Sequence, residues 1–182
     1  MNIKFISIVS CITLFLVSCK PKTAIKTTFL TKIEVNNEDT TDNFPKFKGE
    51  PHSGTYFSHT DSLYKYGSGA RFIIPDSLVN LEIKVRLNMW ARQNDLGGGN
   101  QYAVALQKGD SVLNWAAIRF DKHISESNKW LNVRDSITFP SYLIKEKGLN
   151  IKMFSFNPEG KPSLDTDDIE IIIEKSEQAI LD

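Results

Sequence analysis

One segment, residues 81–92, constrains the fold more than any other part of the chain, because apolar and polar side chains alternate along its whole length. The odd-numbered positions, from Leu81 to Ala91, are all apolar, whereas the even-numbered positions are polar except for Trp90. Successive side chains of a β-strand point to opposite faces of a sheet. This period of two therefore predicts a strand with one face in the core and one face outside it.

The rest of the chain has the same β character. Short apolar or alternating runs, separated by polar turns such as Lys108-Gly109-Asp110, predict further strands. These lie at residues 28–35, 54–59, 70–74, 102–107, 112–120, 130–139, 149–156 and 169–174. Many short strands without a long helical pattern predict an all-β fold, an antiparallel β-sandwich of the jelly-roll type, in a single domain.

The N-terminal segment has the features of a bacterial export signal. Lys4 precedes an apolar run, residues 5–17, which is shorter than the ~20 residues of a membrane-spanning helix and fits the hydrophobic region of a signal peptide. Leu16-Val17-Ser18-Cys19 then resembles the lipobox of bacterial lipoproteins. The resemblance implies cleavage before Cys19 and acylation of Cys19, which would hold the protein at a membrane of the cell envelope. The alternative is an ordinary secreted protein with a cysteine near its cleavage site.

This interpretation divides the chain into a signal peptide at 1–18, a polar tether at 19–28, a β-sandwich at 29–176 and a tail at 177–182. We expect the lipid bilayer as one partner, through acylated Cys19, and the outer membrane as the location, with both periplasmic and surface display open.

The cysteines and the charge balance exclude several classes of site. Cys11 would leave with the signal peptide and Cys19 would be acylated, so the folded domain would contain no disulfide and no thiolate metal site. The precursor has 22 basic and 22 acidic residues, and loss of Lys4 leaves 21 basic against 22 acidic. This balance predicts no basic field that would concentrate nucleic acid or anionic lipid, so we expect no nucleic-acid partner.

Several short motifs resemble jelly-roll carbohydrate-binding modules of the galactose-binding-like superfamily, found in Bacteroidetes-type lipoproteins. His52-Ser53-Gly54-Thr55-Tyr56-Phe57-Ser58 is similar to their H-S-G-x-Y-S segment, and Asp167-Asp168-Ile169-Glu170-Ile171 is similar to the motif that opens their last strand. Between these two motifs the chain contains, in the order of such modules, Gly109-Asp110-Ser111, Trp115, Trp130, Phe139-Pro140 and Phe156-Asn157-Pro158. The resemblance covers about residues 30–175. It implies a jelly roll that often holds a structural calcium ion and sometimes binds glycans.

The same resemblance implies which residues would hold calcium. Asp168 matches the acidic residue before the last strand of such modules, and Glu34 matches an acidic residue on their first strand, with Glu50 as an alternative. Carboxylates are hard oxygen ligands of the kind that calcium prefers. The alternative is that Asp168 only ends a turn and that Glu34 is solvated.

Trp90 is the residue that we expect to contact a ligand. The period of two places it on the outer face of its strand together with Arg86, Asn88 and Arg92. An aromatic ring among polar side chains can stack on the C–H groups of a sugar while its neighbours bond the hydroxyls. The alternative is that a loop or a second sheet covers the ring.

Trp115 and Phe156 are further candidates for such an aromatic platform. Trp115 shares its strand parity with Leu113 and Ala117, so the pattern is equally consistent with a place in the core. Trp130 directly precedes a predicted strand, and we expect it to anchor packing.

Catalytic signatures are weak, so we expect a protein that is not an enzyme. The chain has three histidines and contains no G-x-S-x-G or H-E-x-x-H motif. Glu82 and Glu170 could act as a glycosidase pair only if the fold brought them together. Two functions remain: an envelope-anchored module that binds an oligo- or polysaccharide, or a structural or protein-interaction lipoprotein of the same fold without a sugar ligand.

Overall fold

The computed structural model describes residues 23–38 and 44–180. In these residues the chain forms ten β-strands and three short 3-10 helices. The strands are β1 (Thr23–Val35), β2 (Lys46–Lys48), β3 (Tyr56–Thr60), β4 (Tyr66–Ile73), β5 (Glu82–Gln93), β6 (Gln101–Lys108), β7 (Ser111–Arg119), β8 (Leu131–Phe139), β9 (Leu149–Phe156) and β10 (Leu164–Ile180). The helices are η1 (Asp76–Leu78), η2 (Phe120–Lys122) and η3 (Ser141–Leu143). None of the helices in the described ranges is long and apolar enough to cross a membrane.

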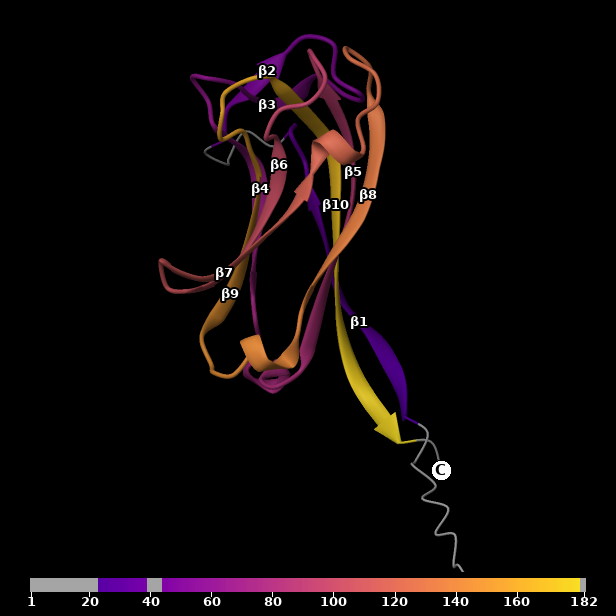
Figure 1. Cartoon of the computed structure of the whole chain (residues 1–182), viewed down its shortest axis with the longest axis vertical. Coiled ribbons are helices and arrows are strands. Elements are labelled where there is room, and N and C mark those ends of the chain that lie inside the picture. Colours follow the sequence, from indigo (N-terminus) through magenta and orange to yellow (C-terminus); the bar gives the residue numbers. More distant parts are fainter. Residues whose placement is uncertain (1–22, 39–43, 181–182) are drawn as a thin grey trace, which may run out of the picture.

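The strands form two antiparallel sheets that face each other (Figure 1). Sheet A has the order β2-β3-β10-β5-β8, with β1 also pairing with β10, and sheet B has the order β4-β9-β6-β7. The pairs are nested, because β3 pairs with β10, β4 with β9, β5 with β8 and β6 with β7. This is one long hairpin rolled up so that successive pairs alternate between the sheets, which is the topology of a jelly roll. The fold class predicted from the sequence is confirmed.

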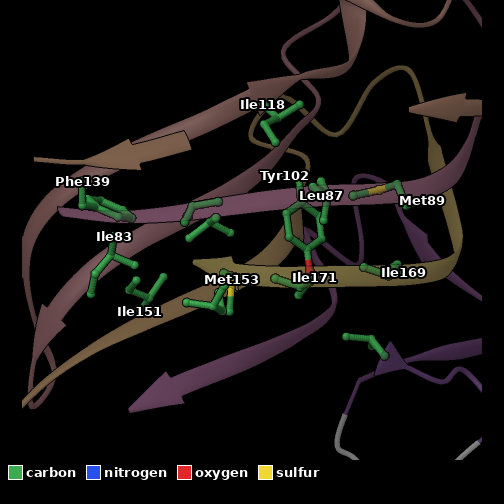
Figure 2. Close-up of a cluster of buried hydrophobic side chains, with 14 of the residues drawn as sticks. Ile83, Leu87, Met89, Tyr102, Ile118, Phe139, Ile151, Met153, Ile169 and Ile171 are labelled. Atoms are coloured by element: carbon green, nitrogen blue, oxygen red, sulfur yellow. The ribbon is translucent and has the colours of Figure 1, made fainter. Parts of the chain in front are cut away.

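The core lies between the two sheets and is built from alternate side chains of their strands (Figure 2). In β5 the odd-numbered side chains from Ile83 to Ala91 are at most 3% exposed. Tyr102, Ile151 and Met153 of sheet B are equally buried opposite them. The even-numbered residues of β5 therefore lie on the outer face of sheet A, as the alternation predicts.

The start of β1 and the end of β10 continue as a two-stranded ribbon beyond the sandwich (Figure 1), since β10 pairs with β5 only as far as Ser176. Ile25 of this ribbon is 73% exposed, and Phe29, further along β1, is 60% exposed. The predicted boundaries were wrong at both ends: residues 23–28, expected to be a tether, belong to β1, and residues 177–180, expected to be a tail, belong to β10. The two segments pair with each other, and neither segment alone has the long alternation that predicts a strand. Cys19 and the predicted signal peptide lie outside the described residues.

An irregularity in β10 shapes one end of sheet A. Residues 164–166 of β10 pair with β3, whereas residues 169–180 pair with β1 along the same edge. The register of β10 against β5 also shifts between Asp167 and Glu170. Asp168 has a φ of 47°, in the left-handed region that aspartate tolerates better than most residues. The two aspartates therefore occupy a bulge at the point where β10 changes its neighbour.

Candidate functional site

The predicted ligand residues of β5 lie on the outer face of sheet A. Arg86 and Asn88 line an open hollow of about 550 Å³, and Asn88 and Trp90 line a second one of about 470 Å³ beside it. The guanidinium of Arg86 forms an ion pair with Glu174 at 2.9 Å. The outer face of sheet A is thus hollowed at these residues, and the polar side chains there already interact with others of the sheet, since Asn88 accepts hydrogen bonds from Asn132 and Arg134.

Trp90 is half-buried because another ring lies on it. The imidazole of His52 stacks on the indole with 3.9 Å between ring centroids and 12° between planes. Asp168 holds this imidazole in place, since its Oδ2 lies 2.7 Å from Nδ1 of His52, while its Oδ1 accepts a hydrogen bond of 2.6 Å from the hydroxyl of Ser53. One face of Trp90 is thus covered by the protein itself. The two motifs that carried the family resemblance meet at this point.

Asp167 fixes the backbone of the covering loop. Its carboxylate is 3% exposed and accepts hydrogen bonds from the backbone N–H groups of His52 (3.0 Å) and Ser53 (3.2 Å). It also accepts a hydrogen bond of 3.0 Å from the side-chain amide of Asn37. Two adjacent aspartates therefore hold one loop. Asp167 binds the backbone N–H groups of His52 and Ser53, and Asp168 binds their side chains.

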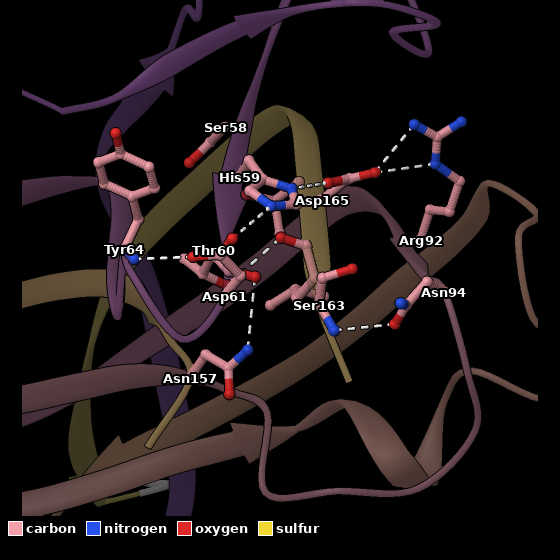
Figure 3. Close-up of polar contacts among 12 residues, drawn as sticks. Ser58, His59, Thr60, Asp61, Tyr64, Arg92, Asn94, Asn157, Ser163 and Asp165 are labelled. Atoms are coloured by element: carbon pink, nitrogen blue, oxygen red, sulfur yellow. Dashed lines mark hydrogen bonds and ion pairs between the residues drawn. The ribbon is translucent and has the colours of Figure 1, made fainter. Parts of the chain in front are cut away.

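Arg92 contributes to the structure of sheet A. Its guanidinium donates to Asp165 from Nε at 3.0 Å and from Nη2 at 2.8 Å, and lies 4.6 Å from the ring centre of Trp130. Figure 3 shows Asp165 between Arg92 and His59, whose Nδ1 lies 2.6 Å from the carboxylate. This hydrogen bond to Asp165 raises the pKa of His59 above its usual value. Arg92 is therefore unavailable as the ligand contact that the sequence predicted.

The residues expected to hold calcium are not brought together. Glu34 forms an ion pair with Lys32 at 2.7 Å, and the side chain of Glu50 is 94% exposed on a loop. Both carboxylate oxygens of Asp168 already have a partner, since Oδ2 lies 2.7 Å from Nδ1 of His52 and Oδ1 accepts a hydrogen bond from the hydroxyl of Ser53. No group of three or more His, Cys, Asp or Glu side chains in the described ranges could hold a metal ion. These side chains do not fit the several free oxygen ligands that calcium requires.

Sheet B carries a second aromatic cluster, which we call the sheet-B platform and define by Tyr66, Trp115, Phe154 and Phe156. The rings of Tyr66 and Phe156 are stacked, with 5.1 Å between centroids and 15° between planes. The ring of Trp115 lies 5.8 Å from both Phe154 and Phe156, edge to face. Trp115 is 44% exposed and Tyr66 is 55% exposed. The two platform candidates named from the sequence, Trp115 and Phe156, therefore do lie together, but on the opposite sheet from Trp90.

The register of sheet B explains why these rings meet. Phe154 pairs with Ala103 of β6, and Trp115 of β7 pairs with Ala105. Both alanines are fully buried although they point away from the core, because the larger rings from the neighbouring strands cover them. Small side chains on the central strand thus let the rings from β7 and β9 approach each other over β6.

A bulge in β4 completes the platform. The register between β4 and β9 shifts between Tyr66 and Gly69, and this shift places Tyr66 directly opposite Phe156. A side chain at Gly69 would collide with the backbone carbonyl of Met153, so only glycine fits at this position.

Sequence reasoning left Trp115 undecided between core and surface, and the structure places it on the surface. Ile118 is buried, whereas Leu113 and Trp115 are exposed, so the set of β7 residues that includes Trp115 faces outward. Tyr66 and Phe154 were missed. The signal that could have found Phe154 is its spacing of two residues from Phe156, which puts both rings on the same face of one strand.

The carboxylates considered for glycosidase chemistry lie far apart. Glu170 pairs with Asn88 of β5, six residues from Glu82 along the same strand. At ~3.3 Å per residue this separation is roughly 20 Å, well beyond the ~5–9.5 Å between the two carboxyl groups of glycosidases. Glu82 and Glu170 therefore do not form such a pair.

A further hollow of about 700 Å³ lies at the loop end of the sandwich and is lined mostly by polar side chains and glycines. The lining residues are His59, Asp61, Ser62, Asn94, Asp95, Gly98, Gly160, Lys161, Pro162 and Ser163. Apart from the imidazole of His59, it offers no ring on which a ligand could stack.

No model of a known protein family matches this chain, and neither does the sequence of any curated protein. Solved structures do match. A cyclase from Fischerella sp. TAU aligns at a TM-score of 0.38 and 14% identity, over 78% of this chain and 72% of the cyclase. TmCBM61 in complex with β-1,4-galactotriose aligns at 0.35 and 13%, over 81% of this chain and 86% of the module. The C-terminal CBM6 of LamC, a marine laminarinase from Zobellia galactanivorans, aligns at 0.35 and 10%, over 81% of this chain and all of the module. TM-scores this low decide neither ligand nor activity, and the jelly-roll assignment stands on the strand pairing.

Proposed function

We propose that this protein is a lipid-anchored, non-catalytic glycan-binding protein of the bacterial cell envelope, and that the sheet-B platform is its ligand site. The observation that carries the proposal is the pair of partly open rings, Trp115 and Tyr66, on one sheet face. Isolated exposed apolar residues are ordinary, but a cluster of exposed rings is typical of a binding surface.

The chemistry of the platform fits a saccharide. Tyr66 and Trp115 lie on either edge strand of sheet B and both approach Phe156, with ring centres 5.1 Å and 5.8 Å from it, so the rings of Tyr66 and Trp115 are at most about 11 Å apart. Polar side chains share the rows of the rings, since Gln101 pairs with Phe156 and Lys152 pairs with Ala105. Rings can therefore contact the C–H faces of the sugars while polar neighbours bond the hydroxyls.

The sheet-B platform is a better ligand site than the outer face of sheet A. On sheet A the indole of Trp90 already stacks on His52, so a sugar would have to displace a ring held by Asp168. On sheet B no comparable loop of the described residues lies over Trp115, which keeps 44% of its surface exposed.

The envelope location rests on the lipobox-like residues before Cys19. β1 begins at Thr23, so an acylated Cys19 would be joined to the ribbon by three residues. The ribbon would then separate the sandwich from the bilayer, which leaves sheet B accessible to polysaccharides of the envelope or its surroundings.

Binding of the soluble mature chain, residues 19–182 with Cys19→Ser, to a glycan array tests this proposal. We expect at least one glycan to bind, and we expect Trp115→Ala to weaken that binding by about 10- to 100-fold, as for the loss of a ring at the centre of an interface. Trp90→Ala serves as the matched control from the other sheet. Absence of binding to every glycan would contradict the assignment. Weaker binding in Trp90→Ala together with unchanged binding in Trp115→Ala would also contradict it.

One observation favours the alternative, a protein-interaction lipoprotein without a sugar ligand. β7 is an edge strand of sheet B, and its residues Val112 and Leu113 are 50% and 48% exposed next to Trp115. An exposed apolar edge strand can pair with a second chain. A monomeric wild-type protein in sedimentation experiments would remove self-association through β7, whereas a dimer that Leu113→Lys dissociates would favour it.

A further inference from the structure

The charged residues are divided unequally between the two sheets. The four strands of sheet B contain no aspartate and no glutamate. All acidic residues of the described strands belong to β1, β5, β8 and β10 of sheet A. From this division and from the residues described below, we infer that the ligand of sheet B is an anionic polysaccharide, bearing carboxylate or sulfate groups, bound by Arg71 and Lys152. The inference rests on the proposed function and specifies its ligand class.

Arg71 and Lys152 are a pair of like charges that the fold itself does not require. They are direct partners in the register of β4 and β9, and both point outward. Like charges directly opposite each other on neighbouring strands are destabilising. Neither side chain forms an ion pair with an acidic residue in the part of the chain that the structure describes. A bound anion would remove this repulsion.

The other two basic residues of sheet B provide a contrast. Lys108 forms an ion pair with Glu146, and Arg119 forms an ion pair of 2.7 Å with Asp121. Both acidic partners lie outside the strands of the sheet. Two of the four basic side chains are therefore neutralised by the protein, and the two that are not are the ones that stand side by side.

The basic pair lies next to the aromatic rings. The row of register partners that contains Arg71 and Lys152 continues through Ala105 to Trp115. The ammonium of Lys152 lies 5.5 Å from the ring centre of Phe154, whose ring in turn contacts Trp115. A sugar stacked on the rings would therefore have its acidic substituent close to Lys152.

A small hollow of about 180 Å³ opens at the same pair. Its lining consists of Phe44, Gly69, Ala70, Arg71, Lys152 and Met153. Glycine and alanine on β4 leave room at this point, and the guanidinium offers a planar fork of donors that matches a carboxylate or sulfate. The hollow is thus a place for the anionic substituent, whereas the rings are the place for the sugar.

The test compares charged with neutral glycans, and compares a double variant of the basic pair with a double variant of the two ion-paired basic residues. The soluble mature chain, with Cys19→Ser, is titrated with polygalacturonate, alginate and chondroitin sulfate, and with methyl-esterified polygalacturonate and galactan as neutral counterparts. We expect stronger binding to an anionic glycan than to the neutral ones. We expect the double variant Arg71→Gln/Lys152→Gln to weaken it by about 10- to 100-fold, the range for the loss of charged hydrogen bonds. The control Lys108→Gln/Arg119→Gln removes the same charge from the same sheet and should change binding little.

The outcomes separate this inference from the proposed function. Preference for a neutral glycan would overturn the ligand class, and anionic binding that depends on Trp115 but not on Arg71 and Lys152 would overturn the role of the basic pair. Either result would leave glycan binding intact. Equal losses in the double variant and its control would indicate non-specific attraction of a polyanion and overturn the inference. Tighter binding to vesicles of anionic phospholipid than to any glycan would overturn both, as would binding to no glycan at all.

Discussion

Replacing Asp167 by alanine is expected to destabilise the domain much more than replacing its neighbour Asp168. Asp167 is 3% exposed and accepts hydrogen bonds from Asn37, His52, Ser53 and the N–H of Asp168. Its removal leaves these donors without an acceptor, at a cost of ~1–3 kcal/mol for each donor that stays buried. The loop donors regain water when the loop loosens, so we expect a total loss of about 3 kcal/mol in the free energy of unfolding.

The expected loss for Asp168→Ala is smaller, at about 1 kcal/mol or less, because its side chain is 41% exposed and its contacts to His52 and Ser53 are on the surface. Urea unfolding measures both variants. With a slope of ~2 kcal/mol per molar, the midpoint of Asp167→Ala should fall by ~1.5 M and that of Asp168→Ala by at most ~0.5 M.

The same pair of variants decides whether calcium belongs to this site. If hydrogen bonds alone hold the loop, the wild-type midpoint should be the same in calcium and in chelator. A wild-type midpoint that falls in chelator, with this sensitivity lost in Asp168→Ala, would refute the hydrogen-bond explanation and restore the predicted metal, because a ligand bound only by the folded state stabilises it. A larger loss in Asp168→Ala than in Asp167→Ala would also refute the hydrogen-bond explanation, whatever the effect of chelator.

Three further predictions concern other parts of the molecule. The hydrogen bond to Asp165 raises the folded-state pKa of His59 above its unfolded value of ~6.5, so its stabilising effect is present below that pH and is lost as the pH rises through the folded pKa. The melting temperature should therefore fall over that pH range; His59→Gln should reduce this fall, and His123→Gln should not change it. Gly69→Ala should lower the melting temperature and weaken glycan binding, because the added methyl group collides with the carbonyl of Met153; a wild-type melt would contradict the tight approach of β4 and β9. Cys19→Ala should give an unlipidated or unprocessed protein, and a wild-type N-terminal peptide without acyl mass would end the lipoprotein interpretation.

Residues 81–92 show which part of a fold is predictable from local sequence. Their alternation is a property of the strand itself, so the buried and outer positions of β5 follow without knowledge of any partner. The ribbon shows the opposite case. Residues 23–28 and 177–180 lack the long alternation of residues 81–92, yet they are strands, and each pairs with the other end of the chain. The local order of apolar and polar residues does not predict such a pairing between distant segments.

Trp90 shows why the correct face is not the same as an open site. Parity placed its ring outside the core, and the ring does lie there. Whether a loop covers the ring depends on His52 and on the aspartates that hold it, which come from positions far apart in the chain. For Trp115 the parity was equally clear, but parity alone does not say which of the two sets faces inward. Tertiary packing decided both cases.

Net charge, like strand parity, does not predict where the side chains lie in the folded protein. Equal numbers of basic and acidic residues, 22 of each, indicate an electrically neutral chain and argue against anionic partners in general. That argument treats charge as evenly spread. The jelly-roll pairing instead collects the strand carboxylates on sheet A, where Glu174 and Asp165 neutralise Arg86 and Arg92. The strands of sheet B contain no acidic residue, and Arg71 and Lys152 stand beside the rings without an acidic partner among the described residues. A chain without net charge can therefore have a locally basic surface, and this surface follows from the order of the strands in space.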